Sequence, residues 1–107
     1  FKELRISIDK DVVRNEEATF YARVSGESMQ GAGLDDGDLL VIDRSMEPQH
    51  DKIAVCYIDG EFTVKRLKVV ADGVFLIPEN PKYKPIKITE ENELIVWGIV
   101  TYVVKKV

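Results

Sequence analysis

The stretch that decides the fold lies in the middle of the chain and reads Ile53-Ala54-Val55-Cys56-Tyr57-Ile58-Asp59-Gly60-Glu61-Phe62-Thr63-Val64-Lys65-Arg66-Leu67. Two runs rich in apolar residues flank the pair Asp59-Gly60. This pair favours a two-residue type I′ turn, because both positions of such a turn need a positive φ. The stretch therefore predicts a β-hairpin. Counting back from the turn gives the opposed pairs Ile58–Glu61, Cys56–Thr63 and Ala54–Lys65.

Further strand signals lie on both sides of this hairpin. Short β-branched and aromatic runs predict strands over 19–24, 39–42, 74–77 and 94–104. The four consecutive apolar residues at 39–42 are typical of a strand that is buried on both faces. Pro78, Pro81 and Pro85 restrict the following segment to irregular or edge structure. Helix is expected only as a turn or two within 9–17 and one short turn after Ser28, so the sequence predicts a mainly-β domain.

Composition narrows the class of protein. The 107 residues suit one domain, and 15 basic against 19 acidic side chains give a net charge of −4. No run of Lys or Arg exceeds two residues, which disfavours direct DNA binding by this domain. The single cysteine, Cys56, excludes an internal disulfide and fits a reducing cytoplasm. No metal cluster, cofactor motif, signal peptide or membrane span is expected.

Lys65 is the first candidate for chemistry. Side chains alternate along a strand, so Lys65 shares its face of the hairpin with Ala54, Cys56, Thr63 and Leu67, which are small or apolar. A charged amine is costly there unless it is paired or loses its proton. Lowering a lysine pKa from about 10.4 to near 7 takes roughly 4–5 kcal/mol, and the neutral amine can then act as a base for a serine. A strand lysine with its tip in solvent is the commoner outcome.

Ser28 is the second candidate. It lies in Ser25-Gly26-Glu27-Ser28-Met29, directly after a predicted strand and before further glycines. A turn of this kind can expose a nucleophilic hydroxyl beside backbone N–H groups that stabilise an oxyanion. By itself, a serine that follows a glycine is usually a simple turn residue.

Several blocks together resemble one family. Ser28 and Lys65 lie 37 residues apart within a series of ordered motifs at 24–29, 36–41, 59–67, 76–86 and 98–100. This series resembles the self-processing Ser–Lys peptidase domain of LexA, UmuD and phage repressors, and the match looks closest to UmuD in its processed form. The resemblance covers about residues 21–106 and is weaker before them.

The resemblance implies a fold and a set of site residues. The expected architecture is a single domain, 1–107, of strongly bent antiparallel sheets of the LexA and signal-peptidase type with little helix. Residues 1–18 would be an arm remnant and 19–107 the core. Ser28 would be the attacking nucleophile and Lys65 its general base. The backbone N–H groups of Ser28 and Met29 would line the oxyanion hole, with the Met29 side chain packed inward.

The resemblance also implies a substrate and partners. Family members cleave an Ala-Gly or Cys-Gly bond in their own N-terminal arm, on stimulation by a RecA filament. Residues 1–27 contain neither pair, so the bond is expected before Phe1, and the chain is interpreted as the product-like form. Processed UmuD forms a homodimer and joins UmuC in the error-prone translesion DNA polymerase V. The expected partners are therefore a second copy, a UmuC-like polymerase and the RecA filament, in the cytoplasm during the SOS response. Trp97 and the last strand fit a dimer surface or the core equally well.

Alternatives remain open at this point. The chain could be the C-terminal domain of a LexA-like or phage repressor, or a non-catalytic dimerisation and docking module. A signal peptidase is disfavoured, because this class of Ser–Lys enzyme would normally need a membrane anchor.

Other candidate sites are disfavoured too. A Ser-His-Asp triad through His50 and Asp51 is disfavoured by their loop-like context. Asp35, Asp36 and Asp38 lack the spacing of a calcium loop and indicate a turn instead. Residues 31–33 are too few for a phosphate loop, and Cys56 is expected to be a small buried hydrophobe.

Overall fold

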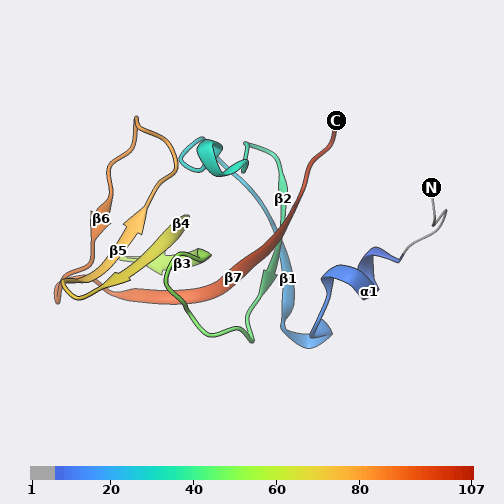
Figure 1. Cartoon of the computed structure of the whole chain (residues 1–107), viewed down its shortest axis with the longest axis horizontal. Coiled ribbons are helices and arrows are strands. Elements are labelled where there is room, and N and C mark those ends of the chain that lie inside the picture. The colour runs from blue at the N-terminus through green and yellow to red at the C-terminus, as the bar shows by residue number, and fades with distance from the viewer. Residues whose placement is uncertain (1–6) are drawn as a thin grey trace.

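The computed structural model describes residues 7–107 and contains one seven-stranded antiparallel sheet (Figure 1). Its strand order is β1-β2-β7-β3-β4-β5-β6. The strands are β1 Thr19–Arg23, β2 Leu39–Asp43, β3 Ile53–Ile58, β4 Glu61–Val70, β5 Gly73–Ile77, β6 Ile86–Lys87 and β7 Leu94–Val104. The helical pieces are short, namely α1 Ile8–Val12 and the 3-10 segments η1 Glu16–Ala18 and η2 Gln30–Ala32. The prediction of a mainly-β single domain with little helix is confirmed.

The β3–β4 hairpin has the register that the sequence predicts. Ala54 pairs with Lys65 and Cys56 with Thr63, across a turn in which Asp59 has φ 48° and Gly60 has φ 89°. Both turn positions therefore have the positive φ of a type I′ turn. The register places Lys65 on the same face as Cys56.

Strand β7 joins two parts of the sheet that bend away from each other. Its residues Leu94 to Ile99 pair with β3, whereas Ile99 to Val104 pair with β2. The register shifts twice along β7: Val41 and Ile42 of β2 pair with Tyr102 and Val100, and Val55 and Cys56 of β3 pair with Gly98 and Val96. Each shift leaves one extra residue in β7, first Trp97 and then Thr101. Such bulges increase the local twist of a strand. Figure 1 shows the long β7 running across the whole molecule, from its pairing with β3 to its pairing with β2.

Strand β7 needs a glycine where the two parts meet. A Cβ atom on Gly98 would lie 2.5 Å from the Cγ2 atom of Ile42, which is fully buried. The absence of a side chain at Gly98 therefore lets β2 approach β7 closely. Trp97, next to it, is partly buried against the core, while Tyr102, Val103 and Val104 at the end of the strand are exposed.

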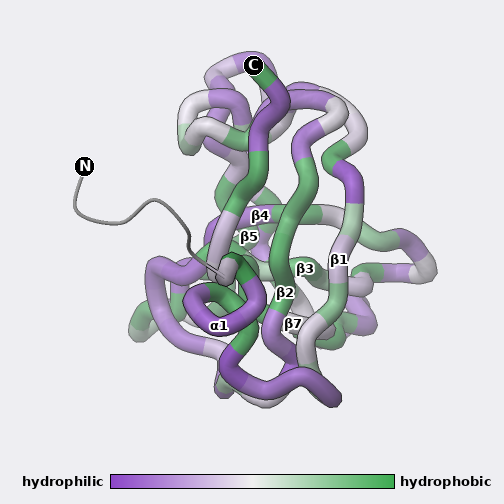
Figure 2. Tube along the Cα trace, turned by 90° about the vertical axis from the view of Figure 1, so that its right-hand side faces the viewer, coloured by the Kyte–Doolittle hydropathy of each residue, from purple (hydrophilic) through white to green (hydrophobic). Residues whose placement is uncertain are grey.

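The core forms two clusters. One contains Met29, Leu34, Leu40, Ile42 and Val55, and the other contains Ala54, Cys56, Leu67, Leu76 and Ile99. Leu40, Val41 and Ile42 are all buried, so β2 is buried on both faces as predicted. Figure 2 shows β2 as apolar along much of its length. The inward packing of Met29 and the burial of Cys56 also agree with the sequence analysis.

The sheet has two edge strands, β6 and β1. Strand β6 is a two-residue edge strand after the proline-containing segment, and β1 forms the other edge. Residues 1–6 of the predicted arm, 1–18, lie outside the described residues, and the arm role stays a prediction. Within residues 7–107, no helix is long and apolar enough to cross a membrane.

Candidate active site

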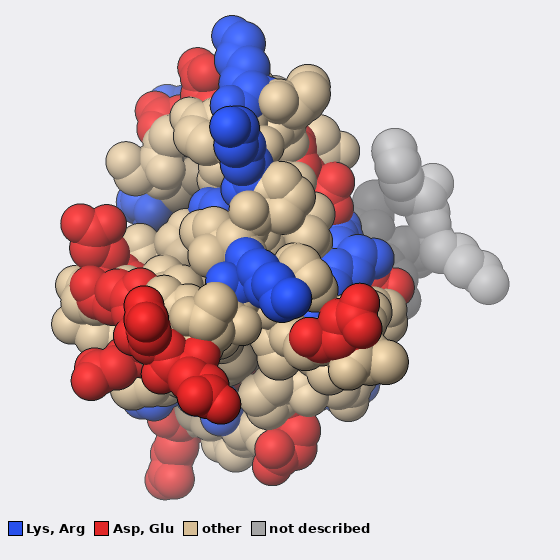
Figure 3. Space-filling model, turned by 90° about the vertical axis from the view of Figure 1, so that its left-hand side faces the viewer, with Lys and Arg blue, Asp and Glu red and all other residues tan. Residues whose placement is uncertain are grey.

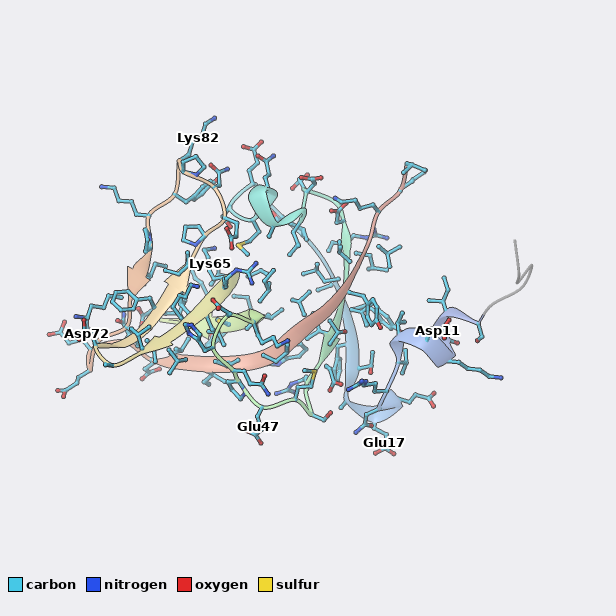
Figure 4. The ribbon with its side chains drawn as sticks, in the orientation of Figure 1. Asp11, Glu17, Glu47, Lys65, Asp72 and Lys82 are labelled. Carbon is cyan, nitrogen blue, oxygen red and sulfur yellow. The ribbon has the colours of Figure 1, made fainter. Side chains whose placement is uncertain are left out.

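Lys65 extends from the middle of β4 into the interior of the molecule (Figure 4). The residue is only 8% exposed, and its neighbours Ala54 and Cys56 on β3 are fully buried. Burial disfavours the charged form of an amine, so it lowers the pKa of Lys65 from its ordinary value of 10.5. A larger fraction of Lys65 is therefore neutral near physiological pH than of a lysine in water.

The amine of Lys65 has three polar partners. Its Nζ atom lies 2.6 Å from Thr63 Oγ1, 3.1 Å from the carbonyl oxygen of Val64 and 3.0 Å from Ser28 Oγ. When protonated, Nζ can donate to all three oxygens. When neutral, it can accept the proton of the Ser28 hydroxyl. The structure thus brings together the two side chains that the sequence analysis singled out.

The thiol of Cys56 lies on the same face of the hairpin and does not compete for this role. Burial raises the pKa of Cys56 to about 11, although the neighbouring Lys65 charge acts in the opposite direction. Cys56 therefore stays a neutral thiol near pH 7, and neutral thiols are poor nucleophiles. This thiol does not supply Lys65 with a counter-charge in that range.

Ser28 lies in the loop of residues 24–38, called the Ser28 loop below, which connects β1 to β2. Gly26 has φ 93°, a conformation that favours glycine, and its N–H donates to Asp36 Oδ1 at 2.8 Å. The loop is closed by Val24 N–H donating to the carbonyl oxygen of Asp38 at 2.9 Å. Met29 attaches the loop to the core, because its side chain is 2% exposed and packs in the first core cluster.

The backbone N–H groups of Ser28 and Met29 are the groups expected to bind an oxyanion. Within residues 7–107, neither of them donates a hydrogen bond to a protein acceptor. Both residues line the same cleft. The two donors are thus free to bind an oxygen that develops negative charge.

A cleft of about 410 Å³ runs beside Ser28, between β1, the Ser28 loop and the start of β4. Phe20, Phe62 and Trp97 form an aromatic wall, with ring centroids 5.2 Å apart for Phe20 and Trp97 and 6.2 Å apart for Phe62 and Trp97. The Arg44 guanidinium lies 4.3 Å from the Trp97 ring centroid and steadies this ring. Strand β1 is an edge strand, so its free side can pair with an extended peptide.

The other candidates from the sequence lie elsewhere. His50 is exposed, and its Nδ1 accepts a hydrogen bond from Val69 N–H at 2.9 Å. Asp35, Asp36 and Asp38 form the turn before β2; there Asp38 accepts a hydrogen bond from Asp35 N–H at 2.8 Å and pairs with Lys105. Gly31 packs against the backbone of Glu79.

Sequence reasoning missed four residues that contribute to this site. It noted that Thr63 shares a face with Lys65 but gave it no role, although the two-residue spacing was a usable signal. It did not connect Asp36 with Gly26. It also did not place Glu79 and Asn80 against the Ser28 loop, where they form hydrogen bonds. The contacts of Glu79 and Asn80 join segments that are far apart in the sequence, and no local pattern marks them.

Comparisons with known proteins agree with this architecture. The sequence profile of the Peptidase S24-like family matches residues 2–101. Protein ImpA of Salmonella typhimurium is 37% identical over 112 residues, covering 99% of this chain and 72% of that protein. Protein MucA of Escherichia coli is 38% identical over 103 residues, covering 95% and 70%. The LexA repressor of Oleidesulfovibrio alaskensis is 41% identical over 79 residues, covering 74% of this chain and 38% of the repressor.

Fold and relatives together define a serine-peptidase type of domain built on a bent antiparallel sheet. The chain belongs to the S24-like peptidase family, because that family's profile spans nearly all of it. The resemblance indicated by the sequence is thereby confirmed at the level of the family. The roles of individual residues are treated below.

Proposed function

We propose that Ser28 and Lys65 form a Ser–Lys catalytic dyad that cleaves an Ala-Gly or Cys-Gly bond in the N-terminal arm of this type of protein. The observation that carries this proposal is the 3.0 Å contact between the buried Lys65 Nζ and Ser28 Oγ. A serine needs an adjacent base to attack a peptide bond, and a lysine can act as that base only when it is neutral. Burial of Lys65 favours this neutral form.

The proposed reaction uses these groups in sequence. Lys65 takes the proton from Ser28 Oγ as this oxygen attacks the scissile carbonyl carbon, and the N–H groups of Ser28 and Met29 stabilise the resulting oxyanion. The Lys65 ammonium then donates its proton to the leaving amine, which leaves an acyl-serine. Lys65 next deprotonates a water molecule that hydrolyses this ester. Throughout, Thr63 Oγ1 and the Val64 carbonyl oxygen keep Nζ directed at Ser28.

The cleft beside Ser28 is the proposed binding place for the scissile segment. An extended segment that pairs with the edge of β1 would run past Ser28, with alternate side chains against Phe20, Phe62 and Trp97. The apolar wall suits an uncharged segment around a small Ala-Gly or Cys-Gly pair.

The wider role follows from the resemblance to UmuD. In the proposed role, the RecA filament stimulates cleavage in the cytoplasm during the SOS response. The processed chain then forms a homodimer that joins a UmuC-like polymerase in error-prone translesion synthesis. Figure 3 shows acidic groups beside basic ones on the face drawn there, rather than one continuous basic surface. This distribution favours partners of protein character over direct DNA binding by the domain.

A second candidate is the self-cleaving C-terminal domain of a transcriptional repressor. The 41% identity to a LexA repressor over 79 residues favours it. The coding sequence upstream of Phe1 separates the two proposals. A repressor would add about 60 or more residues with the periodicity of a helix-turn-helix domain.

The catalytic proposal can be tested with a synthetic peptide that carries an apolar segment around Ala-Gly. The chain is incubated with the peptide between pH 7 and 10, and cleavage is followed by mass spectrometry. Because the base works in its deprotonated form, the rate should rise with pH and be half-maximal below pH 10.5, the ordinary lysine pKa. Ser28→Ala and Lys65→Met should abolish cleavage.

Lys68→Met is the matched control, since Lys68 lies on the same strand but is more exposed and pairs with Asp51. This variant should cleave normally. Undiminished cleavage by Lys65→Met would reject the base assignment. Absence of any cleavage by the unmodified chain would favour a non-catalytic dimerisation and docking module instead.

A further inference from the structure

The segment of residues 78–85, between β5 and β6, lies against the Ser28 loop. In Figure 1 it passes beside η2, and Lys82 marks its outer tip in Figure 4. The N–H of Glu79 donates to the carbonyl oxygen of Ser28 at 2.8 Å, and Gly31 N–H donates to the carbonyl oxygen of Glu79 at 2.7 Å. The Asn80 side chain donates from Nδ2 to the carbonyl oxygen of Glu27 at 2.8 Å.

These hydrogen bonds fix two consecutive peptide planes. In a planar trans peptide, the carbonyl group and the following N–H point in opposite directions. The carbonyl oxygen of Glu27 accepts from Asn80 and, over the longer distance of 3.3 Å, from Gln30 N–H, and because it faces Asn80 the N–H of Ser28 points away from the 78–85 segment. The carbonyl of Ser28 is held by Glu79, so the N–H of Met29 points away from that segment too. Both proposed oxyanion donors are therefore aimed by contacts on the far side of the loop.

The same segment is tied to the strand that carries Lys65. Glu79 Oε1 accepts a hydrogen bond from Arg66 Nε at 2.5 Å, and Arg66 follows Lys65 directly in β4. Both side chains of this ion pair are about two-thirds or more buried, at 28% and 31% exposure. Glu79 therefore contacts the Ser28 loop through its main chain and the strand of Lys65 through its carboxylate.

The fit between the two segments is tight. A Cβ atom on Gly31 would lie 2.5 Å from the carbonyl oxygen of Glu79, which is a backbone atom. Because backbone cannot yield as a flexible side chain does, any other residue at Gly31 would push the Ser28 loop away from Glu79.

We propose that Glu79 and Asn80 are positioning residues that aim the backbone N–H groups of Ser28 and Met29 into an oxyanion hole and hold the Ser28 loop at its distance from Lys65. This proposal rests on the peptidase function proposed above. Neither side chain touches the reacting atoms, so each acts through the loop. The effect is expected on the chemical step rather than on peptide binding.

Asn80→Asp is the sharpest test. The aspartate keeps the shape and the acceptor that binds Lys82 N–H at 2.9 Å, but it cannot donate to Glu27. With the Ala-Gly peptide, kcat should fall about tenfold and KM should stay within about twofold, since a misaimed donor weakens only the transition state. The pH at half-maximal rate should not move, because Lys65 is unchanged. Gly31→Ala should act in the same direction, more strongly.

Lys82→Gln is the matched control, because it makes the same change in net charge on the same segment without touching the Ser28 loop. It should leave kcat and KM unchanged. An unaltered kcat in Asn80→Asp, or an equal loss in Lys82→Gln, would overturn the proposal.

A second measurement separates this proposal from the peptidase proposal. Residual dipolar couplings report the orientation of individual N–H vectors whether or not the chain cleaves a peptide. The couplings of Ser28 and Met29 should change in Asn80→Asp and stay constant in Lys82→Gln. If the unmodified chain cleaves nothing, the peptidase proposal fails, and these couplings still decide whether Asn80 aims the two donors. Unchanged couplings would overturn the positioning role.

Discussion

The β3–β4 hairpin and the Ser28 loop hold the two members of the proposed dyad by different means. Lys65 owes its place to a short-range register, in which a two-residue turn at Asp59 and Gly60 fixes every pair that follows. Ser28 owes its place to a contact within its own loop, between Gly26 and Asp36, and to contacts with the distant segment that contains Glu79 and Asn80. The strand register positions Lys65, whereas hydrogen bonds to the main chain of its loop position Ser28.

This difference predicts how each partner responds to change. Substitutions near Lys65 should alter its chemistry while the hairpin keeps its register, because the register depends on many residues at once. Substitutions that disturb Ser28 can lie far from it in the sequence, because Glu79 and Asn80 hold the main chain of its loop. The four predictions below test this contrast, from the largest expected effect to the smallest.

Lys65→Arg should have the largest effect, a loss of peptide cleavage of at least about a thousandfold, or about 4 kcal/mol. Arginine keeps the positive charge and the donors but cannot lose its proton near neutral pH. The assay is peptide cleavage between pH 7 and 10, with folding checked by circular dichroism. Lys68→Arg, the same change at a more exposed site on the strand, should cleave normally. Substantial activity in Lys65→Arg would mean that the amine orients Ser28 rather than accepting its proton.

Gly98→Ala should lower the free energy of unfolding by about 1–3 kcal/mol, the usual cost of overpacking a core. Its new methyl group would meet the buried Ile42 side chain at 2.5 Å, where β2 and β7 approach each other. Urea denaturation measures this change. A cost below about 0.5 kcal/mol would show that the bend can relax, and that the close approach of the two strands is not required.

Asp36→Ala should lower peptide cleavage about tenfold, or about 1.4 kcal/mol, by releasing the Gly26 N–H and loosening the Ser28 loop. Its effect on the free energy of unfolding should be smaller than this, since Asp36 is exposed. Steady-state kinetics and urea denaturation give the two values. Asp72→Ala, at the turn between β4 and β5, is the control and should change neither. If cleavage survives intact in Asp36→Ala, the loop does not depend on this contact.

Gly60→Ala should have the smallest effect, about 1 kcal/mol in the free energy of unfolding. Gly60 has φ 89°, where a side chain is strained, but a Cβ there would meet no atom within 4 Å. The cost is therefore purely one of backbone conformation, and it can be compared directly with Gly98→Ala by urea denaturation. A larger cost for Gly60→Ala than for Gly98→Ala would reverse the ranking of local and tertiary determinants.

Much of the fold could be predicted because its signals are local. The turn residues Asp59 and Gly60 gave the hairpin, and alternation gave the face of Lys65 and Cys56. The short β6 was expected only as an irregular or edge segment. Three prolines precede it, and its two paired residues are too few to give a strand signal. The 3.0 Å approach of Ser28 to Lys65 had no local signal, and only the family resemblance suggested it.

The sequence by itself determined the strands, the register of the central hairpin and the environment expected around Lys65, because turn chemistry and alternation act over a few residues. The tertiary structure decided where the Ser28 loop lies, through the hydrogen bonds that Glu79 N–H and Asn80 Nδ2 donate to its main-chain carbonyl oxygens. It also decided the depth to which Lys65 is buried, and with it the lowered pKa of its amine. The physical reason is that desolvation and loop closure depend on segments that meet only when the whole sheet bends around β7.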